Sequence, residues 1–258
     1  MRVAFSGSGL LYAMHLGAYQ SIIEKDSSTL TAVSGTSGGA IIAALLAFYP
    51  IDKALLILKS LDPSKAISFN PTAIFQSSFC FGTHIEGELK RTFGTKTFAD
   101  SPIPIYITSS DVISGEPFVF SKETSPNAPI WLAVRASLSI PILYTPVKYL
   151  NKLLVDGGVL NPTPVNVMPP SNAITYGIRV RSAPTVSGYK GLSYLPKVIS
   201  MLTYAVDNTD AYLNEVDDKT NILFLDVKSS GFGVFDTDLL FQNGYLSANA
   251  RLSPSPTL

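Results

Sequence analysis

The first part of the chain contains one short pattern twice: an apolar strand, a turn rich in glycine and serine, and an apolar helix. Residues 2–6 are typical of a buried strand, and Gly7-Ser8-Gly9 separates them from Leu10, Ala13, Met14, Gly17, Ala18 and Ile22 at helical spacing. Residues 30–34 predict a second strand, and Gly35-Thr36-Ser37-Gly38-Gly39 leads into an apolar helix over residues 40–48 that ends before Pro50. Strand and helix units in this order predict an α/β fold with a parallel sheet.

Strands and helices continue to alternate along the rest of the chain. The patterns predict helices over residues 51–61, 84–93, 130–136 and 195–213, and strands over residues 103–108, 117–120, 152–155, 174–180 and 222–227. A last helix carries Leu239, Leu240 and Leu246, with Thr237 or Asp238 as its cap and Gly244 as a weak point inside it. Because we find no linker or low-complexity segment, we expect one domain over residues 1–258, with a flexible tail at residues 250–258.

Composition excludes several classes of function. The chain has 258 residues, 46% of them hydrophobic, and its 19 Lys and Arg balance its 19 Asp and Glu. A neutral chain lacks the positive field that nucleic-acid binding requires, so we expect no nucleic-acid partner. Its single cysteine, Cys80, cannot form an internal disulfide, and no Cys and His pair has the spacing of a zinc site.

The sequence also predicts where the chain resides. The apolar residues 3–5 are followed at once by Ser6-Gly7-Ser8-Gly9, so no signal peptide is visible. The longest apolar run, residues 40–49, would extend about 15 Å as a helix, which is about half the hydrocarbon thickness of a bilayer. We therefore expect a cytoplasmic protein that touches membranes only peripherally.

Ser37 is the candidate nucleophile. Gly35-x-Ser37-x-Gly39 lies between a strand and a helix, which is the context of a nucleophile elbow, and Gly38 gives the turn further room. The helix that begins after Ser37 directs its N-terminal amides toward any negative charge formed there. A five-residue pattern of small residues also occurs as an ordinary turn, so the strand and helix context carries the prediction.

A serine nucleophile needs a base, and the histidines are poorly placed to supply it. His15 lies on the first predicted helix and His84 begins another, and no histidine follows His84, so we interpret both as structural. Asp156 directly follows the apolar strand at residues 152–155 and precedes Gly157-Gly158. It therefore lies where α/β sheets place their sites, although Asp-Gly is also a common turn. An aspartate with a pKa near 3.9 is a weak base, so Asp156 would act in a desolvated pocket that raises its basicity.

The third requirement is a set of donors for an oxyanion. Gly7, Ser8, Gly9 and Leu10 follow the first strand, and their backbone N–H groups can form an anion nest. The same loop fails as a dinucleotide fingerprint and as a P-loop, because neither the third glycine nor a Gly-Lys-Ser/Thr sequence is present. A tight turn without a binding role is the alternative.

Together these motifs resemble the patatin-like phospholipases. The resemblance rests on Phe5-Ser6-Gly7-Ser8-Gly9 with His15-x-Gly17, on Gly35-Thr36-Ser37-Gly38-Gly39, and on Asp156-Gly157-Gly158 with Asn161-Pro162-Thr163-Pro164-Val165. Asp111 with Gly115, Ala136-Ser137 with Pro141, and the segment from Val234 to Tyr245 resemble further family segments. The first motif departs from the family, because Ser8 replaces a glycine and Leu11 and Tyr12 stand where Arg and Gly are usual.

The resemblance implies a three-layer α/β/α sandwich with a mostly parallel sheet and a catalytic dyad of Ser37 and Asp156. It also implies an oxyanion hole at residues 7–10, and an arginine at Leu11 is expected to raise activity if the missing cation matters. We expect a lipid acyl hydrolase of the phospholipase A type that forms an acyl-enzyme and needs no cofactor or metal. An acyltransferase, a thioesterase and a non-catalytic lipid-binding protein remain alternatives.

The expected partners are a lipid substrate and a membrane surface that the protein contacts transiently. Phe69, Phe75, Phe79 and Phe81 could line an acyl channel or touch the bilayer, but irregularly spaced aromatic residues more often pack in a core. The absence of excess positive charge implies that membrane contact is hydrophobic.

Overall fold

A computed structural model describes residues 1–61, 65, 70, 72–73, 78–182, 222–229 and 236–252. The two units at the start of the chain form as predicted. Strand β1 (Arg2–Phe5) leads through a 3-10 turn, η1 (Gly9–Leu11), into α1 (Tyr12–Lys25), and β2 (Ala32–Thr36) leads into α2 (Gly38–Phe48). Because side chains alternate along a strand, Val3, Phe5 and Val33 enter the main core, while Ala4 and Ala32 enter a smaller cluster.

The central sheet is parallel on one side and antiparallel on the other. Its strand order is β10-β9-β1-β2-β4-β8-β7, with β5 also paired to β4. The pairs that join β10, β9, β1, β2 and β4 are parallel, whereas β5 and β8 run antiparallel to β4, and β7 runs antiparallel to β8. The further strands are β4 (Ile105–Asp111), β5 (Pro117–Phe120), β7 (Val147–Tyr149), β8 (Lys152–Asp156), β9 (Thr175–Ser182) and β10 (Ile222–Ser229). The predicted α/β class and mostly parallel sheet are confirmed.

Strands β2 and β8 share one edge of β4. Residues 107–110 of β4 pair with β5, so both β2, which pairs with residues 105–108, and β8, which pairs with residues 109–111, must lie on the other edge. The two strands approach from opposite directions, and their carboxyl ends meet: Thr36 is opposite Thr108 and Asp156 is opposite Ser109. The residues that follow β2 are therefore brought next to the end of β8.

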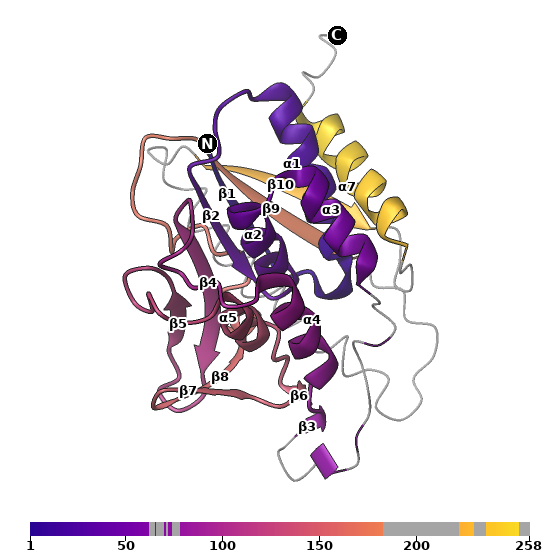
Figure 1. Ribbon diagram of the computed structural model, residues 1–258. Coiled ribbons are helices and arrows are strands. Elements are labelled where there is room, and N and C mark those ends of the chain that lie inside the picture. Colours follow the sequence, from indigo (N-terminus) through magenta and orange to yellow (C-terminus); the bar gives the residue numbers. More distant parts are fainter. Residues whose placement is uncertain are drawn as a thin grey trace.

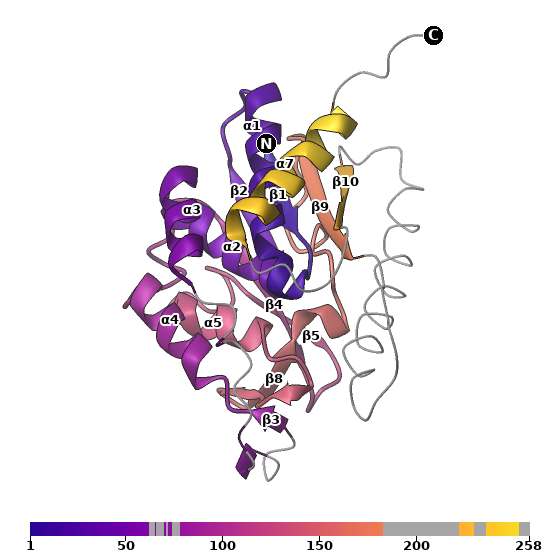
Figure 2. The same cartoon turned by 90° about the vertical axis from the view of Figure 1, so that its right-hand side faces the viewer.

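The described helices that pack on the sheet form one layer (Figures 1 and 2). Helix α7 (Thr237–Leu252) packs on α1, α1 on α2, and α2 on α5 (Ile130–Ser137), while α3 (Ile51–Ser60) and α4 (Thr83–Phe93) lie outside them. A short parallel ribbon joins β3 (Ser78–Cys80) to β6 (Ile142–Tyr144). On the opposite face, Val165 and Met168 pack on the smaller cluster. The helix predicted at residues 195–213 lies outside the described residues.

The last helix differs from its prediction in three details. Its cap is Asp236, whose Oδ1 accepts hydrogen bonds from the amides of Asp238 and Leu239 at 2.9 and 3.1 Å, and not Thr237 or Asp238. Residues 250–252, which were expected in a flexible tail, belong to the helix. Gly244 is a point of close packing and not a weak point, because a Cβ there would overlap the carbonyl of Met14 on α1.

Candidate active site

Ser37 lies in the strained turn expected of a nucleophile elbow. Its φ of 53° is in the left-handed region that non-glycine residues rarely adopt. The turn is held by two hydrogen bonds: the Ser37 amide donates to Ser137 Oγ at 2.8 Å, and the Ala40 amide donates to the Ser37 carbonyl at 2.9 Å. The residue is 5% exposed, so its hydroxyl is held at the end of β2 in a largely desolvated position.

The glycines around Ser37 are required by close approach of the backbone. A Cβ at Gly35 would lie 2.5 Å from the Gly39 carbonyl oxygen, and a Cβ at Gly39 would overlap the Phe5 carbonyl. A Cβ at Gly38 would lie 2.5 Å from both the carbonyl oxygen of Gly9 and the hydroxyl of Ser8. The turn after β2 is therefore packed directly against the loop after β1.

Asp156 ends β8, and its carboxylate lies near enough to the Ser37 side chain for that side chain to lower its pKa. Its Oδ1 accepts from the Gly158 amide at 2.7 Å, its own amide donates to the Ser139 carbonyl at 2.9 Å, and its carbonyl accepts from Ser110 Oγ at 3.0 Å. The structure thus brings together two side chains that are far apart in the sequence.

The carboxyl group of Asp156 is a stronger base than an ordinary aspartate. Burial raises its pKa from 3.8 to about 6, and the Ser37 side chain and the hydrogen bond from Gly158 oppose that rise only in part. The side chain is 5% exposed, so water does little to stabilise its charge. A carboxylate with this pKa is ionised at neutral pH and can still accept a proton from a reacting hydroxyl.

The loop after β1 offers fewer oxyanion donors than the sequence predicted. The Gly7 amide donates to the Pro162 carbonyl at 2.9 Å, so it is not free to bind a ligand. Within the described chain the amides of Ser8, Gly9 and Leu10 have no hydrogen-bond acceptor. Gly9 has a φ of +54°, which turns the chain into η1. Three of the four predicted donors therefore remain candidates.

Neither histidine takes part in this arrangement. His15 is completely buried, its Nε2 donates to the Ser6 carbonyl at 2.8 Å, and burial lowers its pKa to about 3. It is therefore neutral and binds the backbone where β1 leads into the loop that follows it. His84 lies on α4 with its Nε2 3.7 Å from a carboxylate oxygen of Glu88. The structural interpretation of both residues agrees with these contacts.

Sequence reasoning gave no role to three residues that support the site. Ser137 accepts the Ser37 amide, Pro162 occupies the Gly7 amide, and Ser139 binds the Asp156 amide. Ser137 and Pro162 lie in segments that carry the family resemblance, and that was the only signal for them. Ser137 is 100 positions from its partner Ser37, and Pro162 is still farther from its partner Gly7, so no local pattern connects either pair.

The described residues also bear on a metal centre and on the predicted acyl channel. In the described ranges no three His, Cys, Asp or Glu side chains are grouped so as to hold a metal ion. Phe69 and Phe75 and the side chain of Phe79 lie outside the described residues, and the Phe81 carbonyl accepts hydrogen bonds from Arg135 and Thr145. The acyl channel thus stays a prediction.

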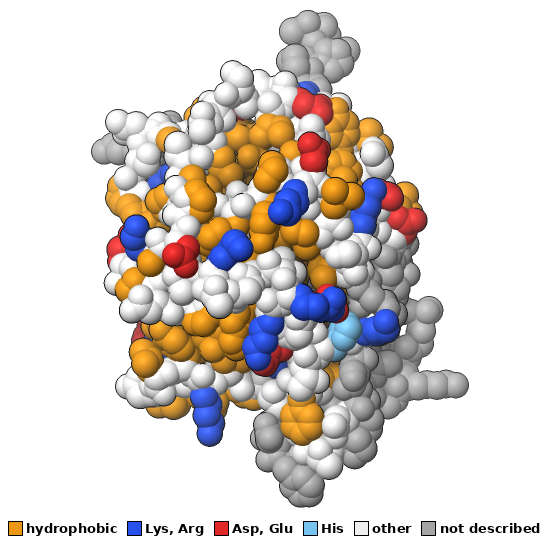
Figure 3. Space-filling view, in the orientation of Figure 1, with side chains coloured by type: hydrophobic (Ala, Val, Ile, Leu, Met, Phe, Trp, Pro, Cys, Tyr) orange, Lys and Arg blue, Asp and Glu red, His pale blue; other side chains and the backbone are white. Residues whose placement is uncertain are grey.

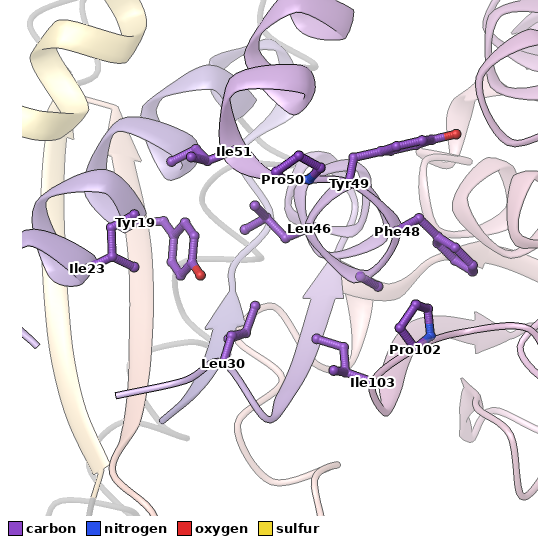
Figure 4. A pocket seen from close by; sticks show the side chains of 11 residues that line it. Tyr19, Ile23, Leu30, Leu46, Phe48, Tyr49, Pro50, Ile51, Pro102 and Ile103 are labelled. Carbon is purple, nitrogen blue, oxygen red and sulfur yellow. The ribbon is translucent and has the colours of Figure 1, made fainter. Parts of the chain in front are cut away.

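One apolar groove, of about 360 Å³, lies away from Ser37 (Figure 4). Tyr19, Leu30, Leu46, Phe48 and Ile103 are among the residues that line it. Leu30 precedes β2 and Ile103 precedes β4, so the groove lies at the amino ends of these strands, whereas Ser37 follows the carboxyl end of β2. It is therefore not part of the candidate active site.

Comparison with known proteins identifies the family. The family model for patatin-like phospholipases matches residues 3–168, which include Ser37, Asp156 and the loop after β1. The chain belongs to the patatin-like phospholipase family. This assignment confirms the resemblance found in the sequence motifs.

Relatives in this family come from bacteria and a virus. The NTE family protein Rv2565 of Mycobacterium tuberculosis is 26% identical over 99% of this chain and 47% of its own length. The protein YqhO of Bacillus subtilis is 30% identical over 62% of this chain and 64% of its own length, and the protein R571 of Acanthamoeba polyphaga mimivirus is 28% identical over 68% of this chain. The chain thus spans about half the length of the mycobacterial relative and about two thirds of the other two.

Solved structures support the fold assignment. VipD of Legionella pneumophila matches 96% of this chain and 65% of its own with a TM-score of 0.60 and 13% identity. The type III effector ExoU matches 97% of this chain and 52% of its own with a TM-score of 0.50 and 16% identity. At these identities the comparison supports the α/β fold of the patatin-like phospholipases and says nothing of substrate.

Proposed function

We propose that the chain is a lipid acyl hydrolase of the phospholipase A type, with Ser37 as nucleophile and Asp156 as general base. Membership of a phospholipase family supports the class of lipid ester hydrolases. The observation that carries the finer proposal is the interaction of the Ser37 side chain with the buried Asp156 carboxylate, beside three backbone amides that lack an acceptor within the described chain.

The proposed reaction proceeds in two stages. Ser37 Oγ attacks the ester carbonyl carbon while its proton passes to Asp156, and the amides of Ser8, Gly9 and Leu10 stabilise the oxyanion. The tetrahedral intermediate then expels the alcohol, which takes the proton from Asp156, and leaves an acyl group on Ser37. Water attacks the acyl-enzyme, gives a proton to Asp156, and releases the fatty acid as the proton returns to Ser37.

Labelling with a fluorophosphonate tests the dyad directly, because the reagent forms a covalent bond with an activated serine. Wild type and Ser21→Ala, which alters another buried serine, should label at the same rate, whereas Ser37→Ala should not label. Asp156→Asn should label at least 100-fold more slowly, in line with the loss of a general base. Labelling of Ser37→Ala at the wild-type rate would disprove the assignment.

The pH dependence of labelling tests the role of Asp156. Because only the ionised carboxylate accepts a proton, the labelling rate should rise with pH and reach half its maximum near pH 6, in agreement with the raised pKa of Asp156. A midpoint near pH 4 would contradict a buried base.

Product analysis separates the hydrolase from its alternatives. The enzyme is incubated with phosphatidylcholine, a triglyceride or an acyl-CoA, with and without an alcohol acceptor. Release of free fatty acid from phosphatidylcholine supports the proposal. Transfer of the acyl group to the alcohol would favour an acyltransferase, preferential cleavage of acyl-CoA would favour a thioesterase, and a wild type that neither labels nor cleaves would favour lipid binding alone.

A further inference from the structure

Two hairpin turns project from the sheet beyond the proposed dyad and carry exposed aliphatic side chains. The turn between β4 and β5 contains Val112 and Ile113, which are 57% and 68% exposed, and the turn between β7 and β8 contains Leu150, which is 81% exposed. The two turns are adjacent, because β4 pairs with β8 and the Val112 amide donates to the Leu153 carbonyl at 2.9 Å. We call these three residues the hairpin tip.

The hairpin tip is held rigidly by the buried carboxylate of Asp111. Asp111 accepts hydrogen bonds from the Ile113 amide and Ser114 Oγ in its own turn, and from the Leu153 amide and Lys152 Nζ in the other, at 2.9–3.2 Å. Burial would raise the pKa of Asp111, but these hydrogen bonds outweigh it and hold the pKa at about 2. The carboxylate therefore keeps its charge, and the aliphatic side chains are presented to solvent by a fixed scaffold.

The tip lies on the same strands as the proposed site. Asp156 is opposite Ser109, so Val112 lies three residues beyond the level of Asp156 along the sheet, and Leu150 lies six residues before Asp156 in the same direction. At about 3.3 Å per residue, the tip begins roughly 10 Å from the Asp156 backbone and reaches up to about 20 Å from it at Leu150. Val159 and Leu160, just after Asp156, are also exposed, by 41% and 38%. Exposed apolar side chains thus occur both just after Asp156 and at the tip.

The charge and shape of the hairpin tip indicate what kind of surface it can bind. Lys152 is paired with Asp111, and the remaining charges of the two hairpins next to the tip, Lys148 and Glu116, are exposed and of opposite sign, so the tip has no excess of cations for an anionic surface. Projecting aliphatic side chains on narrow turns fit between lipid headgroups, where affinity grows with the apolar area buried. Figure 3 shows hydrophobic side chains gathered in the same region of the molecule, over β5, α5 and β8.

We propose that the hairpin tip inserts into a zwitterionic phospholipid surface and places the Ser37 site against the lipid. The inference extends the proposed function by naming the surface that meets the membrane. It is tested by binding, which does not require turnover.

The test measures sedimentation of the protein with sucrose-loaded phosphatidylcholine vesicles, in a Ser37→Ala background that leaves the lipid intact. The variant Leu150→Asn is chosen because Leu150 has a φ of 53°, which asparagine tolerates better than leucine, so folding is not impaired. Ile113→Ser removes the second aliphatic group. Leu56→Asn, on α3, is the matched control, because Leu56 is 66% exposed but lies outside the tip.

The expected result is that Leu150→Asn combined with Ile113→Ser weakens vesicle binding at least tenfold, that Leu56→Asn leaves it unchanged, and that binding is insensitive to salt. In protein that retains Ser37, the double substitution should leave hydrolysis of a soluble short-chain ester unchanged. It should slow hydrolysis of phosphatidylcholine in vesicles. A parent protein that does not sediment with vesicles, or a double variant that sediments as well as the parent, would overturn the proposal. If the protein hydrolyses no ester but its vesicle binding still depends on the tip, the proposed function is refuted and the membrane-binding role of the tip is retained.

Discussion

Replacing Asp156 with asparagine should make the protein more stable at neutral pH while it abolishes turnover. The folded chain raises the pKa of this carboxyl group from 3.8 to about 6 by burying it. Below pH 3.8 the group is protonated in both the folded and the unfolded chain and does not affect stability. As the pH rises toward 6, the unfolded chain loses the proton while the folded chain retains it, so the folded state loses stability, and the penalty is complete above pH 6.

The size of the effect follows from the two pKa values. A tenfold difference in an ionisation equilibrium corresponds to about 1.4 kcal/mol, so ionised Asp156 destabilises the folded chain by about 3 kcal/mol at pH 7.5. At pH 4.5 the same relation gives a penalty of about 1 kcal/mol. Asparagine is nearly isosteric, carries no charge, and retains an oxygen that can accept from the Gly158 amide. The free energy of unfolding of Asp156→Asn should therefore exceed that of wild type by about 2 kcal/mol more at pH 7.5 than at pH 4.5.

Urea denaturation at the two pH values, followed by tryptophan fluorescence or circular dichroism, measures this difference. Asp52→Asn, which removes one exposed carboxylate from α3, is the control for the change in net charge. An Asp156→Asn protein whose advantage over wild type does not grow between pH 4.5 and pH 7.5 would refute the claim that burial makes Asp156 a stronger base.

Three further predictions concern residues outside the proposed dyad. Gly244→Ala should lower the free energy of unfolding by at least about 2 kcal/mol, because the added methyl group overlaps the Met14 carbonyl, and a thermal melt that matches wild type would contradict this. His15→Ala should lower the free energy of unfolding by about 3 kcal/mol through the cavity it leaves, but should retain turnover. His84→Ala should retain both stability and turnover. Loss of turnover in a folded His84→Ala protein would indicate a catalytic triad. The family motif predicts that Leu11→Arg raises activity if the missing cation matters. The structure instead predicts that it destabilises the fold by about 3 kcal/mol or more, because Leu11 is 8% exposed in the core. An equal melting temperature with higher activity would contradict this.

Local patterns predicted most of the elements near the site because each is encoded by neighbouring residues. The turn around Ser37 needs small residues at Gly35, Gly38 and Gly39, and a strand and a helix on either side, all within one short segment. The cap of α7 was placed one or two residues too late, at Thr237 or Asp238, because Asp236 and Asp238 offer the same side chain and only the backbone geometry selects between them.

The pairing of the two strands that carry the site could not be predicted from local patterns. Asp156 was expected at a strand end, but the strand was not known to run antiparallel on the same edge of β4 as β2. That position is available because β5 occupies the other edge of β4, which is a property of the whole sheet. The supporting contact of Ser137 with the Ser37 amide likewise depends on the packing of α5.

By itself the sequence determined which groups can react and which local turns hold them, because the hydroxyl and carboxyl groups and their neighbouring glycines lie within short segments of the chain. Only the tertiary structure decided how strong a base each group is and which backbone amides are free to donate a hydrogen bond. It buried Asp156 and so raised its pKa, it directed the Gly7 amide to Pro162, and it made His15 a neutral anchor. The physical reason is that a pKa and a free donor depend on every atom packed around a group, and those atoms come from distant parts of the chain.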